Sequence, residues 1–374
     1  MSAESTPENP GIPGTGTSGP NRRGKGRRRK PRTRRKGVVV AAWTAAGIVV
    51  LGGTGIGYVY FKLNGNLHSV DINQALGTDR PEKVDNGSQN ILVLGSDSNK
   101  TLGGGTDDGS ARSDTAMIVH IYQGHKKASV VSIPRDTLID RPACTDTQGT
   151  THRAARKVMF NSAYSTGGAA CAVKTVETLT GIRMDHYLEV DFAGFQKLID
   201  RLGGVSVTTT KDIDDPDSHL KLKAGTHRLN GEQALGLVRT RHGVGDGSDL
   251  GRIQLQQAFL KALVDQVGQI GLFTNPKKLY DLADTATKAV TTDSDLGSVN
   301  SLMSWAAGLK GIGASDMHMV TMPVQYDPAD PNRVIVSPAK AQQVWTALKN
   351  DRPIPAAATQ GTATGEAKDV VNGP

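Results

Sequence analysis

Aspartate and arginine side chains occur together in three short stretches of the chain, and both residue types are suited to phosphate chemistry. Each stretch borders an apolar segment rich in β-branched residues, which is typical of a β-strand. We therefore expect the charged side chains at strand ends, although each one alone also fits an ordinary solvated loop charge. The stretches GSD (95–97), ARSDT (111–115) and SIPRDT (132–137) contain Asp97, Arg112, Asp114 and Arg135.

A fourth stretch, VRTRHGVGDGSDLGRIQLQQ, places further charges before and within a predicted helix. At about 100° of rotation per residue, Arg252 and Gln256 fall in the middle of the apolar face of this helix. Asp249 is placed to cap the first turn. Because a buried guanidinium without a partner is strongly destabilising, we expect Arg252 to meet an anionic group.

The nearby aspartates are too few to neutralise every arginine of these stretches. Arg239 and Arg241 add two more, and they share a face if the segment is extended. Phosphate and pyrophosphate are anions that the planar fork of arginine binds bidentately. Asp97 and Asp114 are suited to Mg²⁺, which prefers one or two carboxylates together with phosphate oxygens. The residue types therefore predict a metal-bound phosphate or pyrophosphate, in a site that stabilises charge developing during phosphoryl transfer.

Alternating strand and helix patterns should position these residues. The alternation favours an α/β fold, a layered domain with a central mixed β-sheet flanked by helices. Ligands of such domains usually bind at the carboxyl ends of the strands. The predicted strands are 90–95, 116–122, 128–133, 186–192 and 205–210, and the predicted helices are 169–181, 193–204 and 250–267.

The N-terminal part of the chain has the pattern of a membrane anchor. The net charge of +8 stems largely from NRRGKGRRRKPRTRRK, whereas acids and bases nearly balance from Gly37 onward. Residues 37–61 carry no charge and are long enough to span a hydrocarbon core of about 30 Å. The run is longer than a signal peptide's apolar region and no cleavage site follows it, so we expect a retained, single transmembrane helix. The positive-inside rule then places the N-terminus in the cytoplasm and the chain after Lys62 outside the cell membrane.

These boundaries predict five parts of the chain. A nucleic-acid-binding arm is the alternative for the basic run, but beside a membrane span this run is more simply a topology determinant that contacts anionic lipid, and we expect no nucleic acid as partner. The parts are 1–36, a disordered tail; 37–61, the transmembrane helix; 62–86, a linker; 87–350, the extracytoplasmic domain; and 351–374, a second disordered tail.

The two cysteines, Cys144 and Cys171, are 27 residues apart in the predicted external domain. Outside the membrane such a pair favours a disulfide over free thiols. The spacing lacks the CxxC pattern of a metal site.

In their order along the chain, these motifs resemble the LytR-CpsA-Psr family. The resemblance extends from Asn90 to Val267 and is weak over residues 268–350. It implies an extracytoplasmic phosphotransferase that moves a glycopolymer from a polyprenyl pyrophosphate carrier to peptidoglycan, forms a phosphodiester link and uses Mg²⁺, with pyrophosphatase activity in some members. Besides the stretches given above, the motifs are KVMFNSAYSTGG (157–168), HYLEVDFAGFQKLIDRLGGV (186–205), LNGEQALGLVRTRH (229–242) and DLGRIQLQQ (249–257).

The resemblance also assigns roles to single residues. It makes Asp97 and Asp114 metal-associated acids. The general base stays open: Asp97, Asp114 and Asp249 are candidates, and the alternative is that the metal alone lowers the pKa of the attacking hydroxyl. It implies an apolar cavity for the prenyl chain, for which Phe192, Phe195 and Ile199 are candidates that equally fit plain core. The implied pyrophosphate-binding set is Arg112, Arg135, Arg239, Arg241, Arg252 and Gln256, with Lys157 as a further basic candidate.

Two other functions fit parts of the sequence. A non-catalytic protein that binds wall polymer or lipid pyrophosphate would keep the arginines but would not need both Asp97 and Asp114. A membrane-bound transcriptional attenuator has only the basic tail in its favour, and the predicted topology places the arginine motifs on the other side of the membrane. Neither sequence nor resemblance identifies the polymer.

Overall fold

The computed structural model describes residues 57–97, 113–242, 244, 247–269, 275–363 and 369–373. The chain divides into two units, Met1–Ile56 and Gly57–Pro374, and the described residues all belong to the second. The basic segment and most of the predicted transmembrane span lie outside the described residues, and residues 57–66 are helical. None of the described helices combines the length and the apolar character needed to cross a bilayer.

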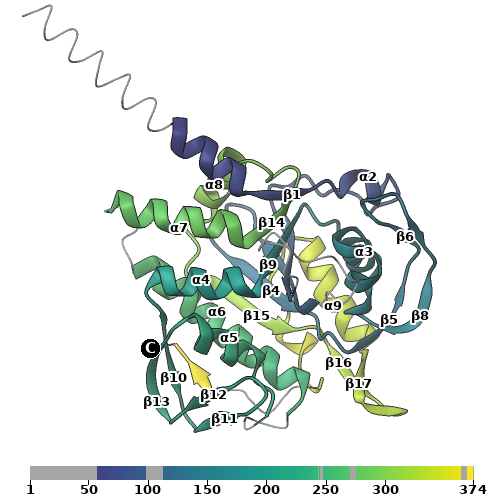
Figure 1. The fold of residues 1–374 in the computed structure, drawn as a ribbon. Helices are drawn as coiled ribbons and strands as arrows, with labels where there is room; N and C mark the ends of the chain where they lie inside the picture. The colour runs from purple at the N-terminus through teal and green to yellow at the C-terminus, as the bar shows by residue number, and fades with distance from the viewer. Residues whose placement is uncertain are drawn as a thin grey trace, which may run out of the picture. The chain divides into compact units, whose positions relative to one another are not determined.

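A seven-stranded mixed β-sheet forms the centre of the described part (Figure 1). β2 runs parallel to β9 and antiparallel to β3, and β3 runs antiparallel to β4. The carboxyl ends of β2, β4 and β9 therefore meet the start of β3 at one edge of the sheet. In spatial order the strands are β1 (His68–Val70), β14 (Val290–Asp293), β9 (His186–Asp191), β2 (Gln89–Ser96), β3 (Ser113–Ile121), β4 (Ala128–Ser132) and β15 (Met317–Thr321).

Helices α3 (Ser162–Thr180) and α9 (Pro338–Lys349) lie together on one face of this sheet (Figure 1). Leu92, Leu94 and Ile118 of the sheet and Val173 and Val344 of the helices are fully buried in one hydrophobic cluster. Alternate strand residues supply the sheet side of this cluster because successive side chains of a strand point to opposite faces. The expected α/β layering is thus confirmed for the described residues.

The disulfide between Cys144 and Cys171 ties α3 to the short strand β6 (Cys144–Thr145). α3 is kinked at Gly167 and Gly168, within the STGG motif. A Cβ on Gly167 would lie 2.3 Å from the Sγ of Cys171, and Gly168 has a φ of +61°, which side chains disfavour. β6 pairs with β7 (Thr151–His152) in a two-stranded sheet. The glycines therefore let the helix approach the disulfide.

A second hydrophobic cluster lies beneath α4 (Phe192–Leu202), α5 (Gly231–Arg239) and α6 (Asp249–Gln269). α6 joins the two clusters, because Leu250 and Ile253 belong to the first and Leu255 and Phe259 to the second. Its buried face therefore crosses from one core to the other along the first turns. The strands of this layer are β10 (Val205–Thr209), β13 (Gly225–Leu229), β18 (Val371–Asn372), β11 (Ile213–Asp215) and β12 (Leu220–Leu222).

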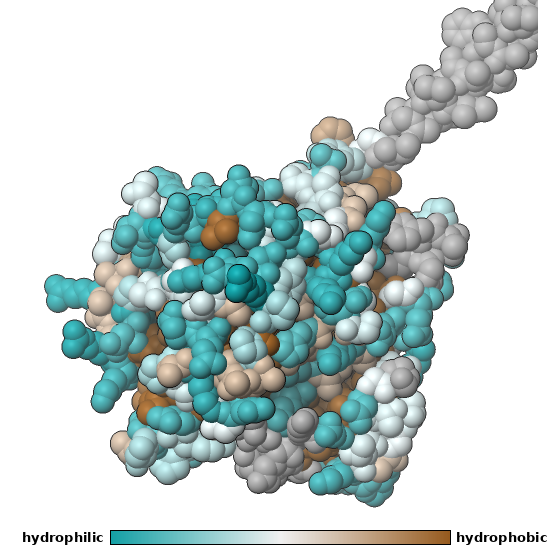
Figure 2. Space-filling model, turned by 180° about the vertical axis from the view of Figure 1, so that it is seen from behind, coloured by the Kyte–Doolittle hydropathy of each residue, from teal (hydrophilic) through white to brown (hydrophobic). Residues whose placement is uncertain are grey.

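The remaining elements lie around these two cores. Strands β16 (Val324–Asp327), β17 (Asp330–Val336), β5 (Thr137–Arg141) and β8 (Ala155–Met159) form a four-stranded sheet. The helices are α2 (Asn73–Leu76), α7 (Pro276–Ala289) and α8 (Val299–Leu309), and the 3-10 turns are Ala314–Asp316 and Ala356–Ala358. The face turned away in Figure 1 is mostly hydrophilic, with its hydrophobic side chains scattered, as Figure 2 shows.

The predicted linker 62–86 is part of the folded domain, which corrects the sequence interpretation. β1 pairs with β14, and Leu63, Ile72 and Leu76 are buried. Arg80 donates a hydrogen bond of 2.6 Å to Glu177 of α3, and both side chains are at most 5% exposed. The polar composition of this segment concealed the spaced apolar residues that anchor it.

The prediction that residues 351–374 form a disordered tail is also wrong for the described residues of this segment. Ile354 and Ala358 are buried in the first hydrophobic cluster. Val370 and Val371 are buried in the second, where β18 pairs with β10. A low-complexity composition therefore hides a segment that completes both cores.

Candidate active site

A β-bulge places Asp114 at the common edge of strands β2, β3 and β4. Gly95 pairs with Thr115 and Ser96 pairs with Ser113, so Asp114 is the extra residue of β3. Bulges re-aim a side chain and often lie beside active sites. Asp97 directly follows β2 at the same edge and is exposed. The two predicted acids thus lie on adjoining strands, and the strand-end expectation is confirmed for both.

Arg135 follows β4 and reaches three acidic residues. Its guanidinium pairs closely with Asp114, and its backbone N–H donates to the Oδ2 atom of Asp249 at 3.1 Å. The next residue, Asp136, lies 3.8 Å from the Nε of Arg135 and 3.7 Å from a guanidinium nitrogen of Arg241. Asp136 was not among the predicted site residues, although it lies within the quoted stretch SIPRDT.

Asp249 pairs with arginines, and Ser248 caps the helix instead. The Ser248 hydroxyl accepts from the N–H of Gly251 at 3.2 Å, so the expected capping by Asp249 is replaced by its neighbour. The carboxylate of Asp249 lies 3.4 Å from Arg241 and pairs closely with Arg252. This carboxylate lies at the N-terminus of α6, where the positive end of the helix dipole stabilises its negative charge.

The inward orientation of Arg252 and Gln256 is confirmed. Their side chains are buried at 5% and 6% exposure. Burial lowers the pKa of Arg252, while Asp249 acts in the opposite sense. The amide nitrogen of Gln256 donates to the hydroxyl of Thr115 at 2.9 Å and to the carbonyl oxygen of Val238 at 3.0 Å. Gln256 therefore holds β3, α5 and α6 together.

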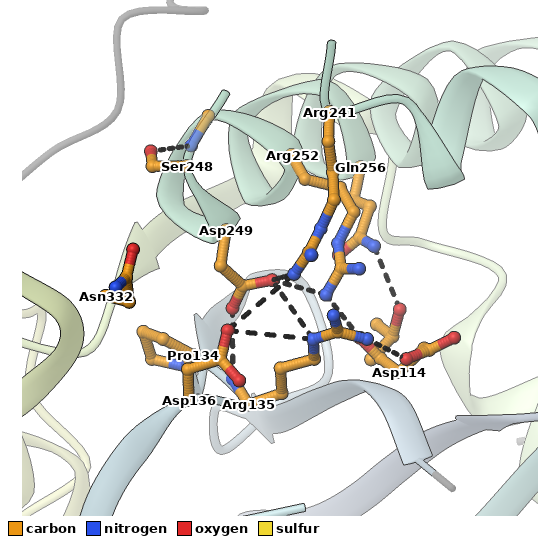
Figure 3. A network of polar contacts seen from close by, with 12 residues as sticks. Asp114, Pro134, Arg135, Asp136, Arg241, Ser248, Asp249, Arg252, Gln256 and Asn332 are labelled. Carbon is orange, nitrogen blue, oxygen red and sulfur yellow. Dashed lines mark hydrogen bonds and ion pairs between the residues drawn. The ribbon is translucent and has the colours of Figure 1, made fainter. Parts of the chain in front are cut away.

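Three of the clustered arginines retain donors that no protein atom uses. The Nε atoms of Arg135, Arg241 and Arg252 are buried and have no hydrogen-bond partner among the described residues. Figure 3 shows these guanidinium groups converging with Asp249 and Asp136. Buried donors without partners are costly, and an anion with several oxygens would satisfy them. The expectation that the nearby aspartates are too few to neutralise the arginines is wrong for these three, because Asp114, Asp136 and Asp249 pair with them. Their Nε atoms nevertheless make no hydrogen bond to a described residue.

Asp215 fixes the segment that carries Arg241. Its Oδ2 atom accepts from the backbone N–H groups of Arg241 at 2.7 Å and His242 at 3.0 Å. Burial by itself would raise the pKa of Asp215, but these bonds and those from Asp217 and Ser218 lower it. Asp215 lies in β11, far from the motifs in sequence, and no sequence signal identified it. The β11–β12 hairpin thus acts as a support for the arginine segment.

Arg239 lies at the apolar side of the cluster. It is exposed, and its guanidinium carbon is 5.4 Å from the ring centroid of Phe192. The Phe192 ring lies near Gly95 and Thr115, at the strand edge. Phe195 packs against Phe259 with centroids 5.7 Å apart. Of the three candidates for a lipid cavity, Phe192 is the one beside the cluster.

Ile199 is fully buried in the second hydrophobic cluster and is therefore a core residue. Lys157 is exposed in β8 with a φ of 50°, and its backbone N–H donates to Asp140. No hydrogen bond or ion pair between described residues joins Lys157 to the arginine cluster. Arg112 lies outside the described residues, so its role stays a prediction.

Arg333 of β17 is a further residue that the sequence interpretation missed. One of its nitrogens lies 3.9 Å from Asp136, which also faces Arg241. A cleft of about 360 Å³ lies between this strand and the start of α6, lined by Asp136, Arg241, Ser248, Asp249, Asn332 and Arg333 among others. The weak resemblance of residues 268–350 to the family motifs gave no reason to single out this position.

The donor set fits Mg²⁺ as the resemblance implies. Arg135 donates a hydrogen bond to the Oδ1 atom of Asp114. The Oδ2 atom of Asp114 accepts no hydrogen bond from another described residue. Asp97 is exposed at the same edge. Two carboxylates beside a phosphate-binding cluster match the preference of Mg²⁺ for few protein ligands and substrate phosphate oxygens.

The mixed sheet and the arginine–aspartate cluster at its edge define an α/β protein with a site suited to phosphate groups. Residues 59–350 match the LytR_cpsA_psr family, and the chain belongs to this family. The family resemblance found in the motifs is confirmed and extends further toward both ends than Asn90 to Val267.

Several curated relatives are similar to the chain. It is 32% identical over 307 residues to the cell wall biosynthesis protein LcpA of Corynebacterium glutamicum, a match that covers 74% of this chain and 58% of LcpA. It is 30% identical over 336 residues to the polyisoprenyl-teichoic acid–peptidoglycan teichoic acid transferase TagT of Bacillus subtilis, covering 87% and 97%. The regulatory protein MsrR of Staphylococcus aureus is 33% identical over 255 residues, covering 67% and 69%.

Solved structures show the same fold. Bacillus subtilis TagV is 27% identical with a TM-score of 0.57, and the match covers 72% of this chain and 98% of that one. A structure described as TagT bound to LI-WTA is 26% identical with a TM-score of 0.54, covering 76% and 98%.

Proposed function

We propose that this protein transfers a glycopolymer from a polyprenyl pyrophosphate carrier to peptidoglycan, forming a phosphodiester link in cell-wall assembly. The observation that carries the proposal is the set of three buried guanidinium Nε donors at one sheet edge, which have no hydrogen-bond partner among the described residues. Pyrophosphate offers oxygens to all of them at once. The relatives named above include a teichoic acid transferase and a cell wall biosynthesis protein, which supports the substrate class.

The side chains perform the following work in this proposal. Arg135, Arg241 and Arg252 bind the pyrophosphate and stabilise the charge that develops on its oxygens. A sugar hydroxyl of peptidoglycan attacks the sugar-side phosphorus, a new O–P bond forms, and the bond to the bridging oxygen breaks. Polyprenyl phosphate leaves with that oxygen. A carboxylate of the site accepts the hydroxyl proton; of the three candidates, Asp97 has no arginine partner among the described residues.

Asp97 and Asp114 are the residues that would hold Mg²⁺. When bound there, the ion would neutralise phosphate charge and lower the pKa of a coordinated hydroxyl. If water takes the place of the sugar hydroxyl, the same arrangement hydrolyses the pyrophosphate.

We also propose the location: a single-pass cell membrane protein with a cytoplasmic N-terminus and an extracytoplasmic catalytic domain. The uncharged run of residues 37–61 behind a basic segment supports this orientation. The site then faces both the lipid carrier and the wall.

The proposal is tested with the full chain in detergent micelles, Mg²⁺, peptidoglycan and a lipid-linked saccharide labelled with ³²P at the sugar-side phosphate. We expect label to appear on peptidoglycan through an alkali-stable, phosphodiesterase-sensitive bond. Binding of the donor without label transfer or phosphate release would contradict the transferase and favour the non-catalytic binding protein.

A further inference from the structure

The cleft between β17 and the start of α6 continues directly from the arginine cluster. Asp136, Arg241 and Asp249 line the cleft and also belong to the cluster. The opposite wall comes from the β16–β17 hairpin through Asn332 and Arg333. Whatever the cluster binds therefore has an adjoining space of about 360 Å³ on this side.

Arg333 has hydrogen-bonding capacity left for a ligand. Its ion pairs with Asp136 and Asp330 are long, at 3.9 and 4.0 Å, and it donates a hydrogen bond to the neighbouring carbonyl oxygen of Asn332 at 3.2 Å. A guanidinium has five N–H donors, and most of those of Arg333 have no hydrogen-bond acceptor among the described residues. Its side chain is 32% exposed, which makes it accessible from the cleft.

The rest of the hairpin wall suits a sugar ring. The side chain of Asn332 is exposed; its amide nitrogen donates to Asp330 at 3.2 Å, and its amide oxygen can accept from a hydroxyl group. The ring of Tyr326, 44% exposed, lines the same cleft. An amide, an aromatic face and a guanidinium together fit a saccharide that carries a negative group better than an apolar ligand.

The two sides of the cluster differ in character. The partly buried Phe192 lies at the Thr115 side, and the exposed Arg239 lies over its ring. Asn332 and Asp114 lie on opposite sides of the network in Figure 3. A pyrophosphate with lipid on one side and sugar on the other would therefore place its sugar toward the hairpin.

We infer that Arg333 and Asn332 form a subsite for an anionic saccharide, one bearing a phosphate or carboxylate group, next to the pyrophosphate. This inference rests on the proposed function in placing a pyrophosphate at the cluster. Asp136 faces both Arg241 and Arg333, so a single carboxylate separates the pyrophosphate position from the subsite. Arg333 is thus a determinant of which saccharide the protein accepts.

The test measures dissociation constants of two synthetic polyprenyl pyrophosphate disaccharides that differ only in a phosphate on the second sugar. The full chain in detergent micelles is compared with Arg333→Ala, with Arg135→Ala and with Arg352→Ala, a surface arginine away from the cleft. We expect Arg333→Ala to weaken binding of the phosphorylated donor about tenfold and to change the neutral donor much less. Arg135→Ala should weaken both donors alike, and Arg352→Ala neither.

An equal effect of Arg333→Ala on both donors, or no effect on any ligand of the test, would overturn the subsite. A second arm measures binding of a soluble peptidoglycan fragment with a free carboxylate. If Arg333→Ala weakens the binding of this fragment alone, the anionic saccharide belongs to the acceptor. Transfer measured on the same donors tests the proposed function separately. Binding that depends on Arg333 without any transfer would refute the transferase and keep the subsite.

Discussion

At the scale of single residues, the arrangement is built on carboxylates that each face more than one guanidinium. Asp249 contacts Arg135, Arg241 and Arg252, and Asp136 contacts Arg135, Arg241 and Arg333. Without these acids the arginines would repel one another in a partly buried site. The acids thus keep the guanidinium groups together, although the Nε atoms of Arg135, Arg241 and Arg252 make no hydrogen bond to a described residue.

Asp114 pairs with Arg135 and, in the proposed function, would also hold Mg²⁺, so its replacement tests both roles. Asp114→Asn keeps the size of the side chain but removes the charge that pairs with Arg135 and that Mg²⁺ requires. We expect the Mg²⁺ concentration for half-maximal turnover to rise by about tenfold or more. Asp136→Asn, which also faces arginines, should leave the Mg²⁺ dependence near that of the unaltered protein. An unchanged Mg²⁺ dependence of Asp114→Asn would remove this residue from the metal site.

At the scale of elements, the strand ends and the helix face could be predicted from the sequence. β-branched runs located β2, β3, β4 and β9, and the helical periodicity of α6 showed that Arg252 and Gln256 face inward. These signals are local. The support of Arg241 by Asp215 and the approach of Arg333 depend on how distant segments pack, so local patterns did not predict them.

Asp215→Asn tests the support from the β11–β12 hairpin. The asparagine places an amide N–H where the carboxylate accepts four backbone N–H groups, so we expect the free energy of unfolding to fall by about 1–3 kcal/mol. Turnover should fall further than stability explains, because the Arg241 segment loosens. Urea unfolding and the transfer assay measure the two effects.

Asp212→Asn is the matched control for this prediction. Asp212 adjoins the same hairpin and pairs with Lys223 at the surface, where ion pairs contribute little. A loss of turnover of the same size in both variants would contradict the specific support of Arg241.

At the scale of the whole molecule, the segments 62–86 and 351–374, whose composition predicts a linker and a tail, complete the two hydrophobic cores. Arg80 and Glu177 form a buried pair between the segment 62–86 and α3.

Arg80→Ala leaves Glu177 buried without its cation, so we expect a loss of about 3–5 kcal/mol in the free energy of unfolding. Lys83→Ala removes an exposed partner of Asp185 and should change the free energy of unfolding by less than about 1 kcal/mol. Urea unfolding followed by tryptophan fluorescence distinguishes them, and equal losses would show that the Arg80 segment is not an anchor.

The folded state also has a predicted pH dependence through His120. Burial lowers the pKa of His120 below its ordinary value of 6.5, although Asp351 acts in the opposite sense. Below pH 6.5 the unfolded chain therefore binds this proton more readily, and the free energy of unfolding falls as the pH is lowered. We expect His120→Gln to be less stable at neutral pH but to lose less stability between pH 7.5 and about 5.5. Parallel pH curves for both proteins would contradict this assignment.

The central claim is that the arginine cluster binds and activates a lipid-linked pyrophosphate. The most direct measurement compares transfer by the full-length protein, Arg135→Ala and Arg352→Ala, with thermal unfolding as a control for folding. The account predicts that Arg135→Ala lowers the transfer rate by about 10²-fold or more while Arg352→Ala transfers at the normal rate. Transfer by folded Arg135→Ala at the rate of the unaltered protein would contradict the account.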